Sequence, residues 1–273
     1  MKTLLALLLA GTSSIVAAEV RMLPIPPTGG FGGGRVGLNV AFENLTDRTQ
    51  ELDLRTQILQ ASSSTVAPRG RPVAWKRLTL LPHQTIADQA TVAFPVVRAE
   101  TRFLVRFTHE DTALGTAEVW VYPSNILAAL TTLLDGESLL LVDAPAWLND
   151  ALVSAKVDCV AATDPSNSRH GRIALVGTPS ETGGSTAGTD LVWTLANAKT
   201  GVIWLKPVSA SETAIQPAYQ TFKVNSTTVV VAQSQTLTNL ATDPWAQLRL
   251  VRMARLAAGQ ENLDLQKSIQ TNP

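Results

Sequence analysis

Hydrophobic residues in the second half of the chain form short, uninterrupted runs. These runs occupy residues 139–142, 159–162, 173–176 and 202–205. None alternates polar with apolar positions, and runs of this kind are typical of parallel strands that are covered on both faces. Segments 146–157 and 190–200 lie between runs and carry apolar residues at helical spacing, and Gly201 follows where a left-handed cap would fall. The pattern predicts a three-layer α/β domain with a mainly parallel sheet.

The first half follows a period of two instead. Apolar residues alternate with polar or small ones, as in Val36, Leu38, Val40 and Phe42, in Leu52, Leu54 and Ile58, and in Phe103, Val105 and Phe107. Turn-forming clusters such as 44–47 and 81–84 separate about six such segments. Short alternating strands with regular turn signals predict an antiparallel β-sandwich over residues 35–123. The fold class expected for the whole chain is therefore β plus α/β in two domains.

Residues 1–18 have the composition of an export signal. Lys2 supplies a positive charge, residues 4–10 form a short apolar core, and small residues at 16–18 form a cleavage site. No later segment reaches the roughly 18 apolar residues of a membrane span. We therefore expect an exported protein, periplasmic or extracellular, without a transmembrane segment once the signal is removed.

The remaining boundaries follow from composition. A Pro- and Gly-rich arm is expected at 19–34, the sandwich at 35–123, an α/β domain at 124–259 and a polar tail at 260–273. Ser124 is the expected N-cap of the first helix of the α/β domain. Residues 227–232 favour a further strand at the sheet edge. Asp243 and Pro244 predict a capped helix that continues to about Ala258, with Trp245, Leu248, Val251 and Leu256 facing inward and Gly259 at its end.

Charge and cysteine content exclude several classes of function. The 22 basic and 22 acidic residues cancel, so the net charge offers no attraction for nucleic acid. Cys159 is the only cysteine, which excludes an internal disulfide, and its apolar run predicts a buried thiol. His83 and His109 belong to the predicted sandwich, and His170 precedes the third run. Three scattered histidines predict no metal site.

Polar residues follow the predicted parallel strands. They are Asp143, Asp164, Thr178 and Lys206, and ligands of open α/β sheets bind beyond the carboxyl ends of the strands. Their order resembles the phospho-acceptor site of response-regulator receiver domains, where acids hold Mg²⁺ and one of them accepts phosphate. That family has adjacent acids after its first strand, whereas this chain has Asp143 followed by alanine. The other interpretation of these residues is polar capping of the strand ends.

The loop at 178–189 offers a second ligand candidate. Ser180 and Thr182 stand in a Ser-, Thr- and Gly-rich stretch between a strand and a helix. The stretch resembles the phosphate loop of flavodoxins, where hydroxyls and backbone N–H groups hold the phosphate of flavin mononucleotide. In flavodoxins this loop follows the first strand, and here it follows the third. A plain connecting loop is the alternative.

Two family resemblances cover larger parts of the chain. The alternating half resembles the immunoglobulin-like domains of bacterial exported proteins, without the cysteine pair of antibody domains. Residues 191–195 and 199–205 resemble the helix, turn and strand of class I glutamine amidotransferase-like domains, which have a flavodoxin-like fold. Catalytic members carry a Cys at the elbow after a strand and a later His. Here the elbow is Gly177-Thr178 and no His follows His170, so the resemblance implies a domain without amidotransferase chemistry.

The sequence therefore favours an exported, non-catalytic protein used for binding or assembly. We expect no cofactor, and a partner that is another exported or envelope protein. Arg249, Arg252 and Arg255 lie three apart on the last predicted helix and form either a solvated face or a surface for a partner or an anion. The alternative function is a hydrolase or transferase, or a protein that binds flavin mononucleotide, using the carboxyl edge of the sheet.

Overall fold

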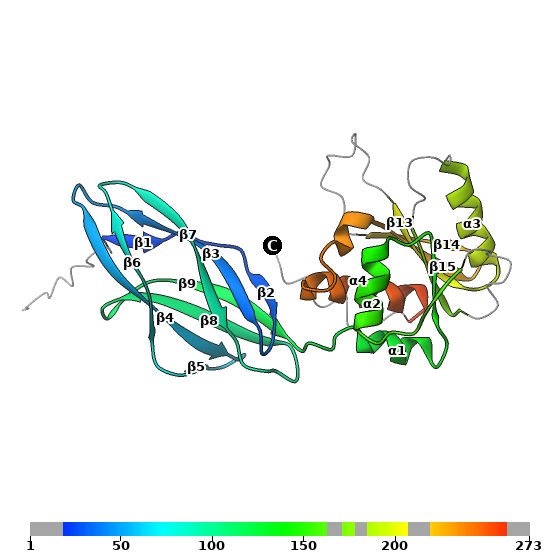
Figure 1. The fold of residues 1–273 in the computed structure, drawn as a ribbon, viewed down its shortest axis with the longest axis horizontal. Coiled ribbons are helices and arrows are strands. Elements are labelled where there is room, and N and C mark those ends of the chain that lie inside the picture. Colours follow the sequence, from blue (N-terminus) through cyan, green and yellow to red (C-terminus); the bar gives the residue numbers. More distant parts are fainter. Residues whose placement is uncertain (1–18, 163–170, 178–184, 207–218, 261–273) are drawn as a thin grey trace, which may run out of the picture. The chain divides into compact units, whose positions relative to one another are not determined.

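The computed structural model describes residues 19–162, 171–177, 185–206 and 219–260. These residues divide into two compact units (Figure 1). The first unit comprises residues up to 28, 35–93 and 101–120, and the second comprises 29–34, 94–100 and the described residues from 121 onward. Strands make up the first unit, and strands alternate with helices in the second. The prediction of a β part followed by an α/β part is confirmed at this level.

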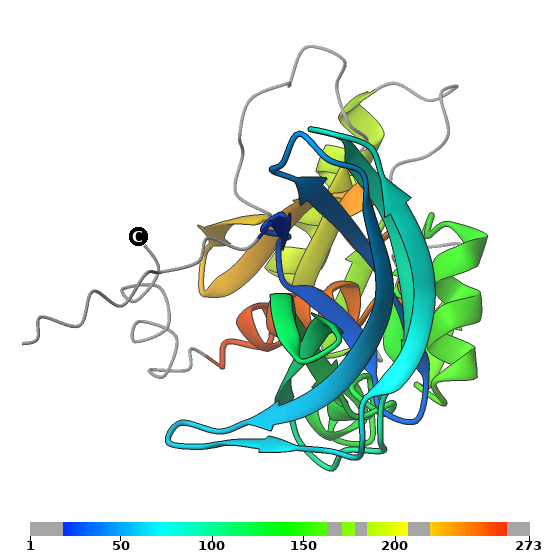
Figure 2. The same cartoon turned by 90° about the vertical axis from the view of Figure 1, so that its left-hand side faces the viewer.

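Two sheets form the β part, and their longest strands pair antiparallel. Its strands are β1 (Val20–Met22), β2 (Thr28–Phe31), β3 (Arg35–Asn44), β4 (Gln50–Ala61), β5 (Val66–Pro68), β6 (Val73–Leu80), β7 (Thr85–Ala93), β8 (Thr101–His109) and β9 (Thr112–Tyr122). One sheet has the order β1-β3-β7, and the other has the order β2-β9-β8-β4-β5, with β6 also paired to β4. Figure 2 shows the curvature of the long strands in blue and cyan. The segment predicted as an arm thus contributes β1 and β2.

A bulge changes the buried face of β4. Leu52 and Leu54 are buried, as the alternation predicts, but Ile58 is only half-buried and its neighbour Leu59 is buried instead. The register of β4 against β6 shifts between Leu54 and Arg55. One extra residue in a strand reverses the side to which later side chains point. The expectation for Ile58 was wrong because the period-two pattern does not reveal a bulge.

Aromatic side chains occupy the core of the β part. Phe42 and Phe107 are fully buried, and their ring centroids lie 5.8 Å apart in an edge-to-face arrangement. Trp75 contacts both rings, at centroid distances of 6.1 Å and 5.4 Å. Edge-to-face packing of this kind adds stability beyond the burial of apolar area.

The α/β part is built on a sheet with the order β11-β10-β12-β13-β15-β14. Its strands are β10 (Leu139–Val142), β11 (Cys159–Ala161), β12 (Ile173–Val176), β13 (Gly201–Lys206), β14 (Tyr219–Val224) and β15 (Thr227–Gln233). The first four correspond to the four apolar runs and pair in parallel, as predicted. β15 is also parallel to β13, and β14 is antiparallel to β15.

Helices cover both faces of this sheet (Figure 1). They are α1 (Ala128–Leu134), α2 (Ala146–Ser154), α3 (Ser185–Asn197) and α4 (Pro244–Ala257), with a short 3-10 helix, η2 (Ser234–Leu237), before α4. Alternate strand residues such as Leu141 and Ile203 pack with α1, α2 and α4. Their neighbours Leu140 and Val202 pack with α3 on the opposite face. Burial on two faces explains why these strands read as continuous apolar runs.

Two edge assignments differ from the expectation. β15 lies inside the sheet, and β14 is the strand at that edge. β11 is the edge strand at the other end, where Val160 is 50% exposed and Cys159 is half-buried. The apolar run at 159–162 is therefore not covered on both faces as predicted, because Val160 and Ala161 are exposed, and the thiol predicted to be buried is only half-buried.

Helix ends also correct two predictions. α1 starts at Ala128 after a turn, with Leu127 rather than Ser124 at the cap position and no side-chain cap. Beyond α3, Lys199 has the left-handed conformation (φ 65°), and Thr200 N donates to Leu195 O at 3.1 Å. Gly201 instead starts β13, and a Cβ there would lie 2.2 Å from the carbonyl oxygen of Ala257. Close backbone approach, rather than a helix cap, requires glycine at that position.

α4 begins and ends as predicted. Asp243 accepts a hydrogen bond from Trp245 N at 2.8 Å, Pro244 occupies the first helical position, and Gly259 (φ 73°) closes the helix. The inward face differs from the expected set, because Trp245, Leu248 and Leu256 are only half-buried. The residues buried on this helix are Pro244, Ala246, Gln247, Leu250, Val251, Met253, Ala254 and Ala257.

Candidate functional site

The carboxyl edge of the parallel sheet is the first place to examine for a ligand site. The chain leaves β10 to form β11 on one side and returns to form β12 on the other. The connections on either side of β10 therefore run in opposite directions, and in open α/β sheets such a point leaves a crevice where ligands bind. Asp143 and Gly177 are the residues that follow the two strands at this point.

Asp143 is exposed and held in a strained backbone conformation. Its φ of 48° lies in the left-handed region, which non-glycine residues seldom adopt. Its carboxylate has no hydrogen bond or ion pair with any residue in the described part of the chain. Strained, exposed acids are found at functional sites, but a single carboxylate cannot by itself supply both an acid and a base.

Gly177 packs against the backbone of Asp143. It is buried, and its N–H donates to the carbonyl oxygen of Val142 at 2.8 Å. A Cβ on Gly177 would lie 2.0 Å from the carbonyl oxygen of Asp143. No side chain can be placed there without moving one of the two backbones. The position after β12 therefore excludes any side-chain nucleophile.

Lys206 ends β13 at the same edge of the sheet. Its Nζ lies 4.3 Å from the ring centroid of Trp204, which is within the range of a cation–π interaction. The indole Nε1 of Trp204 is buried and has no hydrogen-bond partner among the residues that the structure describes. The ammonium thus lies over one face of the ring rather than beside a carboxylate.

The other predicted ligand residues fall outside the described part of the chain. They are Asp164, Thr178, Ser180 and Thr182, and His170 is outside it as well. The structure therefore brings Asp143 and Lys206 to one edge of the sheet and leaves the remaining candidates undecided. Within the described ranges, no three His, Cys, Asp or Glu side chains are grouped so that they could hold a metal ion.

Cys159 lies at the opposite end of the sheet. It is the first residue of β11 and pairs with Leu139, the first residue of β10. Burial, and to a smaller extent the neighbouring Asp158 carboxylate, raise the pKa of the thiol to about 11. The thiol therefore stays protonated at neutral pH, whereas nucleophilic cysteines have a lowered pKa.

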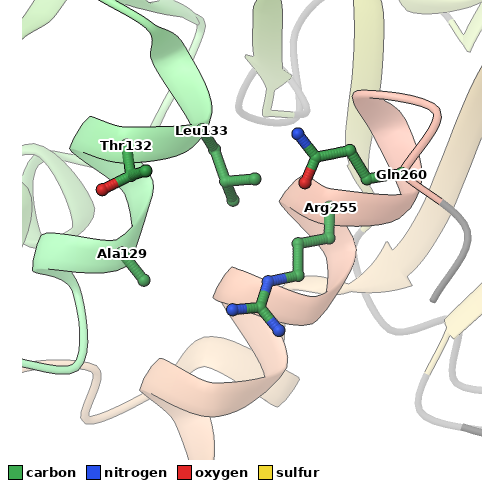
Figure 3. Close-up of a pocket in the computed structure, with 5 residues that line it drawn as sticks. All are labelled: Ala129, Thr132, Leu133, Arg255 and Gln260. Atoms are coloured by element: carbon green, nitrogen blue, oxygen red, sulfur yellow. The ribbon is translucent and has the colours of Figure 1, made fainter. Parts of the chain in front are cut away.

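The three arginines of α4 have different environments. Arg249 is half-buried and donates to the carbonyl oxygen of Thr236 at 3.0 Å, so it connects α4 to η2. Arg252 and Arg255 are exposed. Arg255 also lines a pocket of about 340 Å³ with Gln260, and α1 contributes Ala129, Thr132 and Leu133 on the other side (Figure 3). The sequence pattern did not indicate this pocket, because nothing in it pairs α1 with α4.

None of the helices in the described part of the chain is both long and apolar enough to cross a membrane.

Comparisons with known proteins identify no family. No family model matches the chain, and no curated protein matches it. A partial likeness exists to the Pseudomonas fluorescens alkylpurine DNA glycosylase AlkC bound to DNA containing an abasic site analog, with 19% identity, 38% of this chain and 31% of that chain covered, and a TM-score of 0.32.

Two glycosidases show similar partial likenesses. The Listeria innocua β-glucosidase in complex with gluconolactone is 13% identical over 38% of this chain and 16% of that chain, with a TM-score of 0.28. The Bifidobacterium adolescentis β-glucosidase is 8% identical over 37% and 17%, with a TM-score of 0.29. This chain spans less than a third of each of the three structures. Likenesses at this level indicate neither a shared family nor a shared activity.

Proposed function

We propose that this protein is exported and has a non-catalytic role in binding or assembly, with another exported or envelope protein as its partner. Its β part would be an immunoglobulin-like sandwich. Its α/β part would be a flavodoxin-like domain related to class I glutamine amidotransferase-like domains, without their catalytic residues. The sheet order β11-β10-β12-β13-β15 supports the second assignment, because it has the 2-1-3-4-5 pattern of flavodoxin-like sheets.

The observation that carries the non-catalytic proposal is the packing of Gly177. In catalytic amidotransferase-like domains the nucleophile stands at the elbow after a strand. Here the elbow is Gly177-Thr178, and a Cβ on Gly177 would lie 2.0 Å from the Asp143 carbonyl oxygen. Position 177 therefore has no room for a nucleophilic side chain, and Thr178, the other residue of the elbow, lies outside the described residues.

The sole thiol and the lysine at the edge support the same proposal. Cys159 lies at the amino end of its strand, away from the edge where such sheets bind ligands, and burial keeps its thiol protonated. Lys206 is engaged with the ring of Trp204. Neither residue is arranged as a base or nucleophile beside Asp143.

Flavin binding is the alternative with an observation in its favour. Trp204 brings an aromatic ring, and Lys206 a positive charge, close to the carboxyl edge, as a flavin phosphate and ring system would need. Stacking on the face covered by the Lys206 ammonium would require that side chain to move. A purified protein that is colourless and whose tryptophan fluorescence ignores added flavin mononucleotide would eliminate this alternative.

Export is tested by the mature N-terminus. When the full chain is produced in a secreting host, we expect the protein in the exported fraction with Glu19 as its first residue, as measured by intact-mass spectrometry. A matched variant with Lys2 and the apolar residues 4–10 replaced by polar residues should stay in the cytoplasm. Retention of residues 1–18 in an exported wild type would contradict the cleavage site.

The binding role is tested by crosslinking in the same compartment. A photo-reactive residue replaces Trp193, which is 48% exposed on α3, or Phe222, which is 38% exposed on β14. We expect a discrete adduct with one exported or envelope protein, and the same yield when Asp143 and Lys206 are both changed to alanine. If the double variant loses the adduct and also loses an enzymatic activity that the wild type shows, the enzyme alternative is favoured instead.

A further inference from the structure

β14 is an open edge of the α/β sheet. It pairs with β15 in an unbroken antiparallel register of six residues, and among the described residues no strand pairs with its other side. An open edge presents unpaired backbone N–H and C=O groups, which a further strand can bind. β14 contains no proline, glycine or acidic residue, and its only charged residue is Lys223. It therefore lacks most of the features by which proteins block an edge.

The other strands at sheet edges are short, interrupted or covered. β1, β5 and β11 have three residues each, β5 ends in proline, and β2 contains two glycines. β7 is longer, but its Asp88 forms an ion pair with Lys76 of β6, and the two strands are in contact. Within the described ranges, β14 is thus the edge best suited to pairing with another strand.

The turn between β14 and β15 determines which backbone groups point outward. The turn consists of residues 225–226, and Val224 pairs with Thr227 across it. The pair that closes a two-residue hairpin is hydrogen-bonded, and hydrogen-bonded pairs alternate with non-hydrogen-bonded ones along an antiparallel ladder. The N–H and C=O groups that point away from β15 are therefore those of Tyr219, Thr221 and Lys223.

These outward groups match a second copy of the same strand. Two β14 strands can run antiparallel about a two-fold axis at Thr221, so that each Thr221 lies opposite the other. Each Tyr219 then lies opposite Lys223 of the second copy. Every pair in this register is of the hydrogen-bonded kind, so all the outward N–H and C=O groups of the strand find partners.

The side chains that this register brings together are compatible. Thr221 and Lys223 are exposed, and Phe222 is 38% exposed. A pair of threonines and a lysine beside an aromatic ring are favourable across strands, and no charge lies opposite a like charge. On the other face of the sheet, Gln220 lies opposite Phe222 of the second copy, and the two Phe222 rings become diagonal neighbours. The pairing would therefore cover an aromatic side chain that is partly exposed in one copy.

We infer that two copies of this chain associate through β14, in a register centred on Thr221, and form one continuous sheet. A strand of another protein could bind the same backbone groups, but β14 itself also supplies matching side chains. The inference goes beyond the binding role proposed above. It needs neither export nor another protein, so either proposal can fail without the other.

Sedimentation equilibrium of the full mature chain measures this association. We expect a monomer–dimer equilibrium with a Kd of about 100 μM or tighter. Thr221→Pro should raise the Kd at least about tenfold, because proline removes an outward N–H at the centre of the pairing without removing a bond to β15. Thr221→Val is the matched control, since it keeps that N–H and a branched side chain, and its Kd should stay within about threefold of the wild type. A wild type that is still monomeric at about 1 mM, or a dimer that Thr221→Pro does not weaken, would overturn the inference.

Cysteine crosslinking tests the register and does not require the proline variant to fold. In a Cys159→Ser background, Thr221→Cys should form a disulfide-linked dimer on mild oxidation, because the Cα atoms of a hydrogen-bonded pair lie about 5.5 Å apart, within disulfide range. Lys223→Cys is the matched control. Lys223 is exposed on the same face of the same strand, but in this register its counterpart lies about 14 Å away along the strands. Equal crosslinking by the two variants, or none by Thr221→Cys, would contradict the proposed pairing.

Discussion

Gly177 and Gly201 are required for the same reason, the close approach of another backbone. A Cβ would lie 2.0 Å from the Asp143 oxygen in one case and 2.2 Å from the Ala257 oxygen in the other. Neither constraint can be read from the residues nearby in sequence, because each partner belongs to another element. The left-handed conformations are instead adopted by Lys156 and Lys199, which follow α2 and α3.

Gly177→Ala should destabilise the α/β part. The added methyl forces the strand end and the Asp143 segment apart, and overpacking of this kind costs about 1–3 kcal/mol in free energy of unfolding. Gly70→Ala is the comparison, because Gly70 is exposed and a Cβ there would have no neighbour within 4 Å. At that position only the backbone conformation, with a φ of 89°, opposes alanine, so this variant measures the conformational cost without overpacking. Chemical denaturation measures both variants. An unchanged midpoint for Gly177→Ala would show that the two segments separate freely.

Cys159 should react slowly with iodoacetamide at pH 8. With a pKa of about 11, roughly one thiol in a thousand is ionised at that pH, against about a quarter for a free cysteine. The rate should rise with pH until about 11, because the raised pKa keeps the thiol protonated below that value. Asp158→Asn should increase the rate at pH 8, since it removes the smaller of the two causes. Mass spectrometry of the alkylated protein gives the rates, and a plateau near pH 8 would contradict the raised pKa.

Helix and strand ends explain most differences at the scale of elements. The start of α1 is a turn rather than a side-chain cap, and Asp135 and Gly136, both with positive φ, end that helix. The bulge in β4 moves burial from Ile58 to Leu59. Such features shift a boundary or a face by a few residues without changing the type of element. Sequence periodicity reports the average spacing along a segment, so it identifies the element better than its ends.

Lys199→Gly should stabilise the protein. Lysine in a left-handed conformation has a steric cost that glycine avoids, so we expect a gain of about 0.5–1 kcal/mol in free energy of unfolding. Lys223→Gly is the matched control, because Lys223 is exposed in β14 and glycine weakens strands by a similar amount. Thermal unfolding should move upward for the first variant and downward for the second. If the unfolding temperature falls for both variants, the lysine side chain at position 199 stabilises the protein by more than its left-handed backbone conformation costs.

At the scale of the whole molecule, each unit contains its own core. Phe107 is fully buried among aromatic rings of the β part, and Leu250 is fully buried in the core between α4 and the sheet. Local stability in proteins follows such cooperative groups of packed residues. The two units are therefore expected to respond separately to core mutations.

Phe107→Ala and Leu250→Ala test this expectation. Each should cost about 2–5 kcal/mol through the cavity it leaves. Hydrogen exchange followed by mass spectrometry should speed up in peptides of residues 35–93 and 101–120 for the first variant. For the second it should speed up in peptides of residues 121–260. Equal acceleration throughout the chain in both variants would indicate a single cooperative unit.

The candidate site could be predicted only in part. The apolar runs place Asp143 and Lys206 at strand ends, and the parallel pairing brings those ends to one edge of the sheet. The pocket at Arg255 was missed, although its arginine was among the residues singled out. Its other wall comes from α1, more than 100 residues earlier in the chain, and no local pattern records which helices become neighbours.

The sequence alone determined the element types, the division into a β part and an α/β part, and the parallel pairing of the apolar strands. These features depend on hydrophobic spacing, which is a property of each segment by itself. Only the tertiary structure decided which strand lies at an edge, which glycine faces another backbone, and which side chains share a pocket. Those features depend on contacts between segments far apart in the chain, and such contacts leave no mark on the spacing within either segment.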